Sequence, residues 1–247
     1  ADVVAAGVLP AGAISIVCGS SAGLLDALQP FDVLSFTGSA ETAAVIRSHP
    51  KVAAQSVRVN IEADSLNSAM LLPGAAAGSE PFELFVREVV REMTVKSGQK
   101  CTAIRRAFVP EALYDAAAQA IAARLAKVTV GNPRNEAVRM GALVNREQWQ
   151  TVQDGIAALS TQTEVLFDGR QAPLIAADPA AAACVGPTLL GTRNPEAADK
   201  VHSLEVFGPC ATLMPYRDTA QAAALIRRGE GSLVCSLYGD DPAPLAA

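Results

Sequence analysis

Short runs of apolar residues alternate along this chain with longer stretches of helical periodicity. In the first 62 residues the apolar runs lie at 13–18, 32–36 and 56–62, and the helical stretches lie at 22–28 and 40–48. Later apolar runs lie at 104–109, 164–167, 188–190, 211–214 and 233–238, together with helical stretches at 82–95, 111–127, 146–159 and 219–228. Strands that alternate with helices favour a parallel sheet covered by helices. We therefore expect an α/β fold.

The composition limits the class of protein. The 247 residues are 50% hydrophobic, which is enough for one large core or two smaller ones. No apolar run reaches the roughly 20 residues that cross a bilayer, which argues against a membrane protein. The net charge is −5 and the basic residues are dispersed, which argues against a nucleic-acid-binding surface.

The cysteines and histidines indicate free thiols rather than disulfides or a metal centre. Five cysteines without a CxxC pair are typical of a cytoplasmic protein: Cys18, Cys101, Cys184, Cys210 and Cys235. Two histidines without ligand spacing argue against zinc, and we expect no metal. Residue 1 is not Met and residues 1–9 resemble the tail of a helix, so we expect a fragment of a longer protein.

The sequence Thr37-Gly38-Ser39 joins an expected strand to an expected helix. The N-terminus of a helix offers free backbone N–H groups and partial positive charge, and both suit a phosphate. The Ser39 hydroxyl adds a further donor. A plain helix cap at Ser39 is the alternative, and the residues alone leave it open.

Cys101 and Glu62 are candidates for covalent and acid–base chemistry. Cys101 follows Lys100 in a polar loop at the end of the helix expected at 82–95, and a cationic neighbour favours the nucleophilic thiolate. Glu62 ends an expected strand, where ligands of a doubly wound sheet bind, and a partly buried carboxylate there suits a general base. An ordinary free cysteine and a surface carboxylate are the alternatives.

Glu205 and Phe207 lie in the sequence Glu-Val-Phe-Gly-Pro. A carboxylate can accept hydrogen bonds from ribose hydroxyls, and an aromatic side chain two residues later can pack against a flat ring. A simple Gly-Pro turn is the alternative.

The order and spacing of these features resemble the aldehyde dehydrogenase family. Phe-Thr-Gly-Ser ends at Ser39, Gly-Gln-x-Cys ends at Cys101, and Glu-x-Phe-Gly-Pro begins at Glu205. The successive steps are 23 residues from Ser39 to Glu62, 39 from Glu62 to Cys101 and 104 from Cys101 to Glu205. The resemblance covers essentially the whole chain and about the second half of the family's catalytic unit. Longer runs are similar to one branch, the dehydrogenase part of bifunctional ring-opening enzymes of phenylacetate breakdown: IEADSLN (61–67), REVVREMT (87–94), GQKCTAIRR (98–106) and MGALVN (140–145).

The resemblance implies a fold in two parts. Residues 1–62 would form the C-terminal part of a Rossmann-type, nicotinamide-cofactor-binding domain. Residues 63–247 would form an α/β catalytic domain, truncated at its C-terminus. The resemblance also implies that Cys101 attacks an aldehyde and becomes a thioester, and that Glu62 activates the water that hydrolyses this thioester.

Cofactor, substrate and partners follow from the same resemblance. Thr37, Gly38 and Ser39 would contact the cofactor pyrophosphate, Glu205 its nicotinamide ribose, and Phe207 the nicotinamide side. The expected cofactor is NADP, with NAD as the alternative. The expected substrate is a small-molecule aldehyde, with a CoA-linked semialdehyde as the candidate. We expect the full-length protein to be a cytoplasmic homo-oligomer without nucleic-acid or membrane partners, and the fragment alone to be inactive.

The chain departs from the common family pattern in places that affect these expectations. Glu-Ala-Asp-Ser at 62–65 stands where Glu-Leu-Gly-Gly is usual, Leu204 replaces the first of two glutamates, and Ala43 replaces a frequent glycine. Two alternatives stay open: an aldehyde dehydrogenase that transfers the acyl group to CoA, and a non-catalytic domain of the same fold. The first class usually lacks the base equivalent to Glu62, and the second would not need Cys101. Arg105 and Arg106 suggest a role with CoA phosphates, but we expect this basic pair to be solvated at an edge strand.

Overall fold

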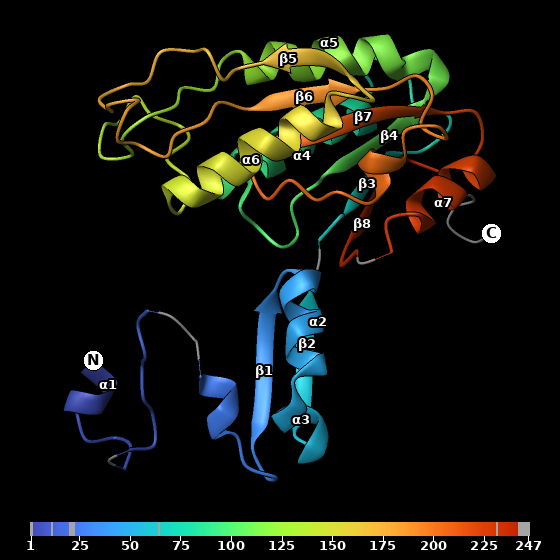
Figure 1. The fold of residues 1–247 in the computed structure, drawn as a ribbon. Helices are drawn as coiled ribbons and strands as arrows, with labels where there is room; N and C mark the ends of the chain where they lie inside the picture. Colours follow the sequence, from blue (N-terminus) through green and yellow to red (C-terminus); the bar gives the residue numbers. More distant parts are fainter. Residues whose placement is uncertain (1, 11, 20–22, 64, 231, 242–247) are drawn as a thin grey trace. The chain divides into compact units, whose positions relative to one another are not determined.

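The structure is a computed structural model that describes residues 2–10, 12–19, 23–63, 65–230 and 232–241. The chain forms two compact units, Ala1–Ala63 and Asp64–Ala247, and each has its own sheet (Figure 1). Among the described residues, no helix is both long and apolar enough to cross a membrane.

The first unit is built on two parallel strands. Its elements in chain order are α1 (Asp2–Ala5), the 3₁₀ helix η1 (Leu24–Ala27), β1 (Val33–Gly38), α2 (Ala40–Ser48), α3 (Pro50–Ala54) and β2 (Arg58–Ala63). The register of the two strands places Thr37 beside Glu62 and Gly38 beside Ala63. The sequence-based boundaries of α2 are confirmed, because Ser39 begins the helix as its N-cap.

One expected strand of the first unit is wrong. Residues 13–18 form no strand, and the side chains of Ile14 and Ile16 are 54% and 80% exposed. An apolar run becomes a strand only where a neighbouring strand takes up its backbone N–H and C=O groups, and 13–18 pair with no strand of the described part. The short helix α3, which starts at Pro50, was not predicted.

The second unit contains a six-stranded sheet in the order β5-β6-β7-β4-β3-β8. The strands are β3 (Ser68–Leu71), β4 (Arg106–Pro110), β5 (Glu164–Asp168), β6 (Thr188–Gly191), β7 (Cys210–Tyr216) and β8 (Cys235–Tyr238). All neighbours run parallel except β5 and β6, so the sheet is mixed rather than purely parallel. The helices are α4 (Glu80–Thr94), α5 (Tyr114–Leu125), α6 (Arg146–Leu159) and α7 (Thr219–Arg227), with short 3₁₀ helices η2 (Val95–Gly98), η3 (Glu111–Leu113) and η4 (Asp199–His202).

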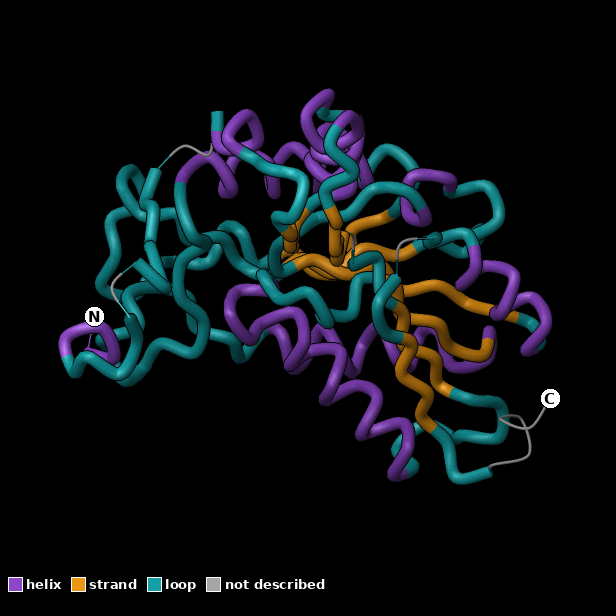
Figure 2. Tube along the Cα trace, turned by 90° about the horizontal axis from the view of Figure 1, so that it is seen from below, coloured by secondary structure: helices purple, strands orange, loops and turns teal. Residues whose placement is uncertain are grey.

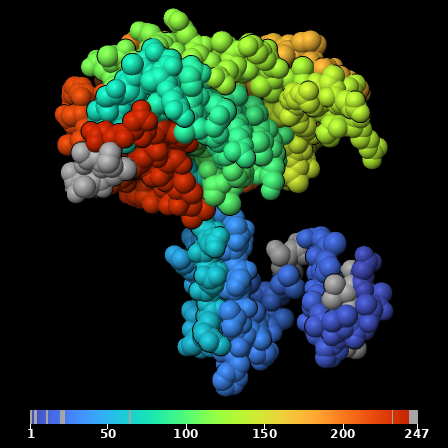
Figure 3. All heavy atoms as spheres, turned by 180° about the vertical axis from the view of Figure 1, so that it is seen from behind, coloured from blue at the N-terminus to red at the C-terminus, as the bar shows by residue number. Residues whose placement is uncertain are grey.

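Helices cover both faces of this sheet (Figures 1 and 2). Alternate residues of β4 point to opposite faces: Ala107 and Val109 pack in one apolar cluster with α4 and α5, and Phe108 packs in another with α6 and α7. Figure 3 shows α4 and α5, coloured teal to green, on the surface of the second unit. The result is a three-layer α/β/α arrangement.

The apolar stripe of α4 is confirmed. Phe85, Val86, Val89 and Met93 are completely buried against the sheet, and Pro81 lies in the first turn of the helix. Each such side chain contributes about 1.5–3 kcal/mol through the apolar area that it removes from water. This burial fixes the end of α4 and therefore the start of the loop that carries Cys101.

Arg106 and its neighbour Arg105 are buried, so the expectation that they are solvated is wrong. β4 lies inside the sheet rather than at its edge, and Arg106 is 1% exposed. Its guanidinium donates to the Leu225 and Ile226 carbonyls (3.0 and 2.9 Å) at the C-terminus of α7. A cation is favourable there because the last carbonyls of a helix carry partial negative charge.

His202 packs against Arg106 in the same buried cluster. The Arg106 guanidinium lies 3.1 Å from His202 Nδ1, and His202 Nε2 lies 2.8 Å from the Pro195 carbonyl oxygen. Since the guanidinium can only donate, Nδ1 accepts and the neutral Nε2–H tautomer is assigned. Burial lowers the pKa of His202 from 6.5 to about 4.

We predict that His202 makes the second unit acid-sensitive. The folded-state pKa of about 4 lies below the unfolded value of 6.5, so the unfolded chain binds more protons between these pH values. The free energy of unfolding is then fully retained above pH 6.5 and falls by up to about 3 kcal/mol as the pH decreases to 4. Urea unfolding followed by the fluorescence of Trp149, the single tryptophan, measures this. His202→Gln should flatten the profile, and His49→Gln, in the first unit, is the matched control. An unchanged profile in His202→Gln would contradict the prediction.

Candidate active site

The first unit brings Thr37, Gly38, Ser39 and Glu62 together at the carboxyl ends of β1 and β2. Thr37 and Glu62 are paired across the two parallel strands. All four residues are exposed. The partial burial that would favour Glu62 as a base is therefore not present in this unit.

Ser39 has the simpler of the two roles considered from the sequence. Its Oγ accepts a hydrogen bond from the Thr42 N–H at 3.2 Å and caps α2. A phosphate role for this turn is compatible with that cap, because capping uses only one of the N–H groups at the helix start. The contact with a cofactor stays a prediction.

In the second unit, Cys101 lies in a turn between η2 and β4 and its thiol is exposed and free. Lys100 precedes it, but the Lys100 ammonium pairs with both carboxylate oxygens of Glu92 at 2.8 and 2.9 Å. The positive charge next to the thiol is therefore shared with a carboxylate of α4.

The backbone before Cys101 is strained. Lys96, Ser97 and Gly98 have φ values of 52°, 55° and 70°, in the left-handed region. A non-glycine residue there costs about 1–3 kcal/mol and persists only where the surroundings hold it. Such strain is frequent at functional sites, and here it lies next to the candidate nucleophile.

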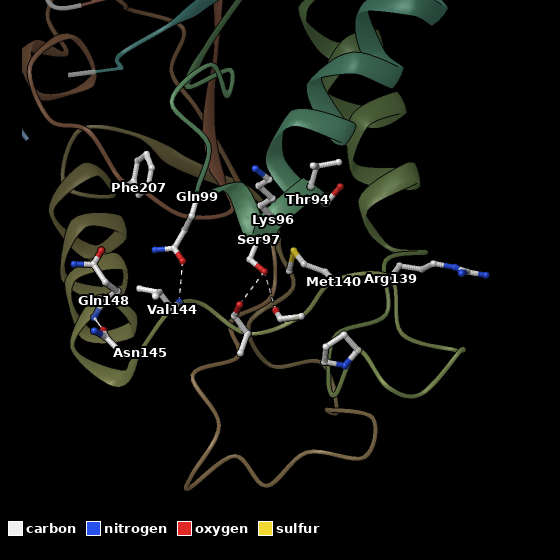
Figure 4. A pocket seen from close by; sticks show the side chains of 14 residues that line it. Thr94, Lys96, Ser97, Gln99, Arg139, Met140, Val144, Asn145, Gln148 and Phe207 are labelled. Carbon is white, nitrogen blue, oxygen red and sulfur yellow. Dashed lines mark hydrogen bonds between the residues drawn. The ribbon is translucent and has the colours of Figure 1, made fainter. Parts of the chain in front are cut away.

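Hydrogen bonds to a second loop hold the strained segment in place (Figure 4). The Ser97 hydroxyl donates to the Gly141 carbonyl at 2.9 Å. The Val144 N–H donates to the Gln99 side-chain oxygen at 2.9 Å. These contacts fix the loop on the side that faces residues 141–144.

Asn67 fixes the other side of the Cys101 turn and was not singled out from the sequence. Its side-chain nitrogen donates to the carbonyl oxygens of Cys101 and Ala103 at 2.8 and 3.0 Å. Its side-chain oxygen accepts from the Leu233 and Val234 N–H groups, both at 2.9 Å. Asn67 is completely buried. The sequence carried one signal for it: a polar amide at the start of an apolar run needs hydrogen-bond partners once it is buried.

The structure brings Glu205 and Phe207 to the Cys101 loop through Arg105. The Arg105 guanidinium lies 3.7 Å from Glu205 Oε1 and 5.3 Å from the centre of the Phe207 ring. The Ser65 hydroxyl also donates to Glu205 Oε1. Ser65 is one of the residues that depart from the common family pattern. Its hydroxyl holds Glu205, the one carboxylate left where the common pattern has two glutamates.

Two hollows border these residues. A groove of about 960 Å³ beside the strained loop is lined by residues that include Gln99, Met140, Val144, Asn145, Gln148 and Phe207. A smaller hollow of about 280 Å³ is lined by residues that include His202, Glu205 and Arg228. Phe207 and Glu205 thus border different hollows, and both side chains contact the Arg105 guanidinium.

The predicted site residues are divided between the two units. Cys101, Glu205 and Phe207 belong to the second, and Glu62 with the Thr37–Ser39 turn belongs to the first. Among the described residues, no group of three or more His, Cys, Asp and Glu side chains could hold a metal ion.

Comparison with known proteins gives the family. The sequence profile of the aldehyde dehydrogenase family matches residues 1–245. The chain is 54% identical over 244 residues to the 3,4-dehydroadipyl-CoA semialdehyde dehydrogenase of Aromatoleum evansii, covering 98% of this chain and 47% of that protein. The chain spans about half the length of the curated relatives that match nearly all of it.

Solved structures share the fold. An NADP-dependent enzyme of E. coli superposes with a TM-score of 0.80 at 25% identity, over 98% of this chain and 48% of that chain. The betaine aldehyde dehydrogenase of Staphylococcus aureus, solved with NAD+, gives a TM-score of 0.74 at 22% identity, over 86% of this chain and 40% of that chain. At that identity the second likeness supports the fold alone.

We predict that Gly98→Ala disrupts the Cys101 loop. The left-handed φ of 70° strains any other residue, and a Cβ would overlap the Gly208 carbonyl oxygen. Gly74→Ala is the matched control, because Gly74 has a φ of 90° but open space around it. The control should cost about 1–2 kcal/mol of unfolding free energy from backbone strain, and Gly98→Ala about 1–3 kcal/mol more from the overlap. Equal losses in urea unfolding, followed by Trp149 fluorescence, would show that the loop has room to move.

Proposed function

The chain belongs to the aldehyde dehydrogenase family, and we propose that it supplies the nucleophilic cysteine of an enzyme that oxidises an aldehyde to the carboxylic acid. The observation that carries the proposal is the exposed Cys101 thiol, held at the end of a strained loop by the buried Asn67 side chain. An unremarkable free cysteine would not need such support.

Cys101 would attack the aldehyde carbon as the thiolate and form a carbon–sulfur bond. Its backbone N–H donates to no group in the described part of the chain, and it is free to donate to the oxyanion that develops on the substrate oxygen. Asn67 and Arg105 donate hydrogen bonds to backbone carbonyl oxygens of this turn, and neither uses the Cys101 N–H group. Loss of hydride from the attacked carbon then leaves a thioester on Cys101.

A nicotinamide cofactor, when bound, supplies the hydride acceptor for this chemistry. Two residues of the second unit that contact the same Arg105 guanidinium support such a group: Glu205 is a carboxylate that can accept from ribose hydroxyls, and Phe207 offers an aromatic face. Thr37, Gly38 and Ser39 would meet the pyrophosphate at the N-terminus of α2. NADP is the proposed form, supported by the likeness to the NADP-dependent enzyme of E. coli, and NAD is the alternative.

Glu62 would act as the base for hydrolysis of the thioester. Its carboxylate lies at the carboxyl end of β2, where ligands of a doubly wound sheet bind, and it would take the proton of a water molecule there. The water oxygen then bonds to the acyl carbon, and the Cys101 thiolate leaves. Hydrolysis therefore returns Cys101 to its thiolate form for the next turnover.

The proposed substrate is a CoA-linked semialdehyde formed in the breakdown of aromatic compounds, phenylacetate in particular. The support for this class is the 54% identity to the semialdehyde dehydrogenase of Aromatoleum evansii. All five cysteines are free thiols, which suits the proposed cytoplasmic location.

We predict that Glu62→Gln separates oxidation from hydrolysis in the protein as encoded. The variant should still form about one reduced cofactor per Cys101 in the first turnover, because Cys101 and the cofactor contacts are unchanged. The steady-state rate should fall by about 10²–10⁴-fold, since the thioester loses its general base. Rapid mixing with cofactor absorbance measures both phases. Cys101→Ser is the control that should abolish the first turnover, and equal loss of both phases in Glu62→Gln would exclude its role as the base.

The product distinguishes hydrolysis from transfer to CoA. With Glu62 as base, we predict that the aldehyde carbon appears as a free carboxylate, even when free CoA is present. Mass spectrometry of the product measures this. Formation of a new acyl-CoA at the aldehyde carbon would favour the acylating alternative, and the absence of any oxidation would favour the non-catalytic one.

A further inference from the structure

Arg105 is a buried cation whose contacts lie on two separate loops. Its guanidinium is 3% exposed. One terminal nitrogen donates to the Gly208 carbonyl at 2.8 Å. The other donates to the Gly98 carbonyl at 2.7 Å and lies 3.5 Å from the Lys100 carbonyl.

The two loops are those that carry the candidate nucleophile and the candidate cofactor contacts. Gly98 and Lys100 lead directly to Cys101. Gly208 follows Phe207, whose ring the guanidinium also overlies at 5.3 Å. A planar fork with several fixed donors can hold two carbonyls at a set spacing, which a flexible ammonium cannot do.

Burial of this charge is costly and is only partly compensated. Burial lowers the pKa of Arg105, and the nearby Glu205 carboxylate opposes that shift. The Nε atom is buried without a hydrogen-bond partner and lies 3.7 Å from Glu205 Oε1. Because a buried ion pair of this kind is often no more stable than apolar residues of the same size, stability alone does not account for an arginine here.

The adjacent Arg106 provides the contrast. It is equally buried, but its guanidinium contacts α7, the Leu66 carbonyl and His202. Those contacts join structural elements and do not reach residues 97–101 or 205–208.

We propose that Arg105 is a positioning residue that locks the Cys101 loop to the Glu205–Gly208 segment, so that nucleophile and cofactor contacts keep a fixed spacing. This rests on the proposed function. Ser65 completes the arrangement, since its hydroxyl and the Arg105 guanidinium approach the same oxygen of Glu205. Both of these contacts go to one oxygen, and in the described part of the chain no group donates to the second, which the proposal leaves for a ligand.

The test is single-turnover formation of reduced cofactor by Arg105→Met, Arg105→Lys and Arg106→Met in the protein as encoded. The amplitude measures the fraction of folded, competent sites, and the rate constant measures alignment within them. Arg105→Met should lower the rate constant by about 100-fold, as expected for a displacement of about 1 Å between reacting groups. Arg105→Lys keeps the charge beside Glu205 and should recover amplitude, but its rate constant should stay at least about 10-fold low.

Arg106→Met is the matched control. It should lower stability and amplitude and leave the rate constant within about twofold of the parent. A rate constant that is unchanged in both Arg105 variants, or one that falls as far in Arg106→Met, would overturn the proposal. If the protein without substitutions forms no reduced cofactor with any aldehyde, the proposed function fails instead. That result differs from the two outcomes that would overturn the role of Arg105.

Discussion

The position of the Cys101 thiol depends on hydrogen bonds that come from outside its own loop. Lys96 and Ser97 lie in a backbone region that non-glycine residues avoid, so the segment would relax if it were isolated. The Asn67 amide and the Arg105 guanidinium bind its carbonyls, while the loop at 141–144 binds its side chains. Each partner comes from a different part of the second unit. The position of the candidate nucleophile is therefore a property of the whole unit, and the packing around the loop stabilises the strain.

Two adjacent arginines show how a central strand separates neighbouring residues. Arg105 precedes β4 and contacts the loop after α4 and the loop before β7, whereas Arg106 opens the strand and contacts the C-terminus of α7. Successive side chains of a strand leave on opposite faces, and helices cover both faces of this sheet. Both charges are buried for that reason, and each needs its own set of acceptors. The acceptors of Arg105 connect the two loops of the candidate site, and those of Arg106 connect β4 to α7 and to the Leu66 carbonyl.

The candidate chemistry is divided between two units of unequal size. The second unit has an extensive core on both faces of its sheet, and it holds Cys101, Glu205 and Phe207. The first has two strands and few buried side chains, and it holds Glu62 and the turn that ends at Ser39. The family profile nevertheless matches both. The candidate nucleophile Cys101 and the candidate nicotinamide contacts Glu205 and Phe207 thus belong to the better-packed unit, where small displacements are most strongly resisted.

Local sequence patterns were enough to predict much of the fold and the loop position of the candidate nucleophile. The boundaries of α2 and α6, the buried stripe of α4 and the loop position of Cys101 could all be read from neighbouring residues, because caps and 3.6-residue repeats act over one or two turns. The strand expected at 13–18 failed because a strand also needs a partner, which no local pattern reveals. The family itself followed from order and spacing along the chain.

The sequence by itself determined the family, the boundaries of helices such as α2 and α6, and which thiol, carboxylates and Thr-Gly-Ser turn are candidates for the chemistry. Only the tertiary structure decided that Asn67, Ser65 and Arg105 support those groups, and that Arg105 and Arg106 are buried. The physical reason is range. Helix caps and apolar repeats act between residues close in sequence, whereas the buried Asn67 amide is satisfied by groups 34 to 167 residues away, from the Cys101 carbonyl to the Val234 N–H.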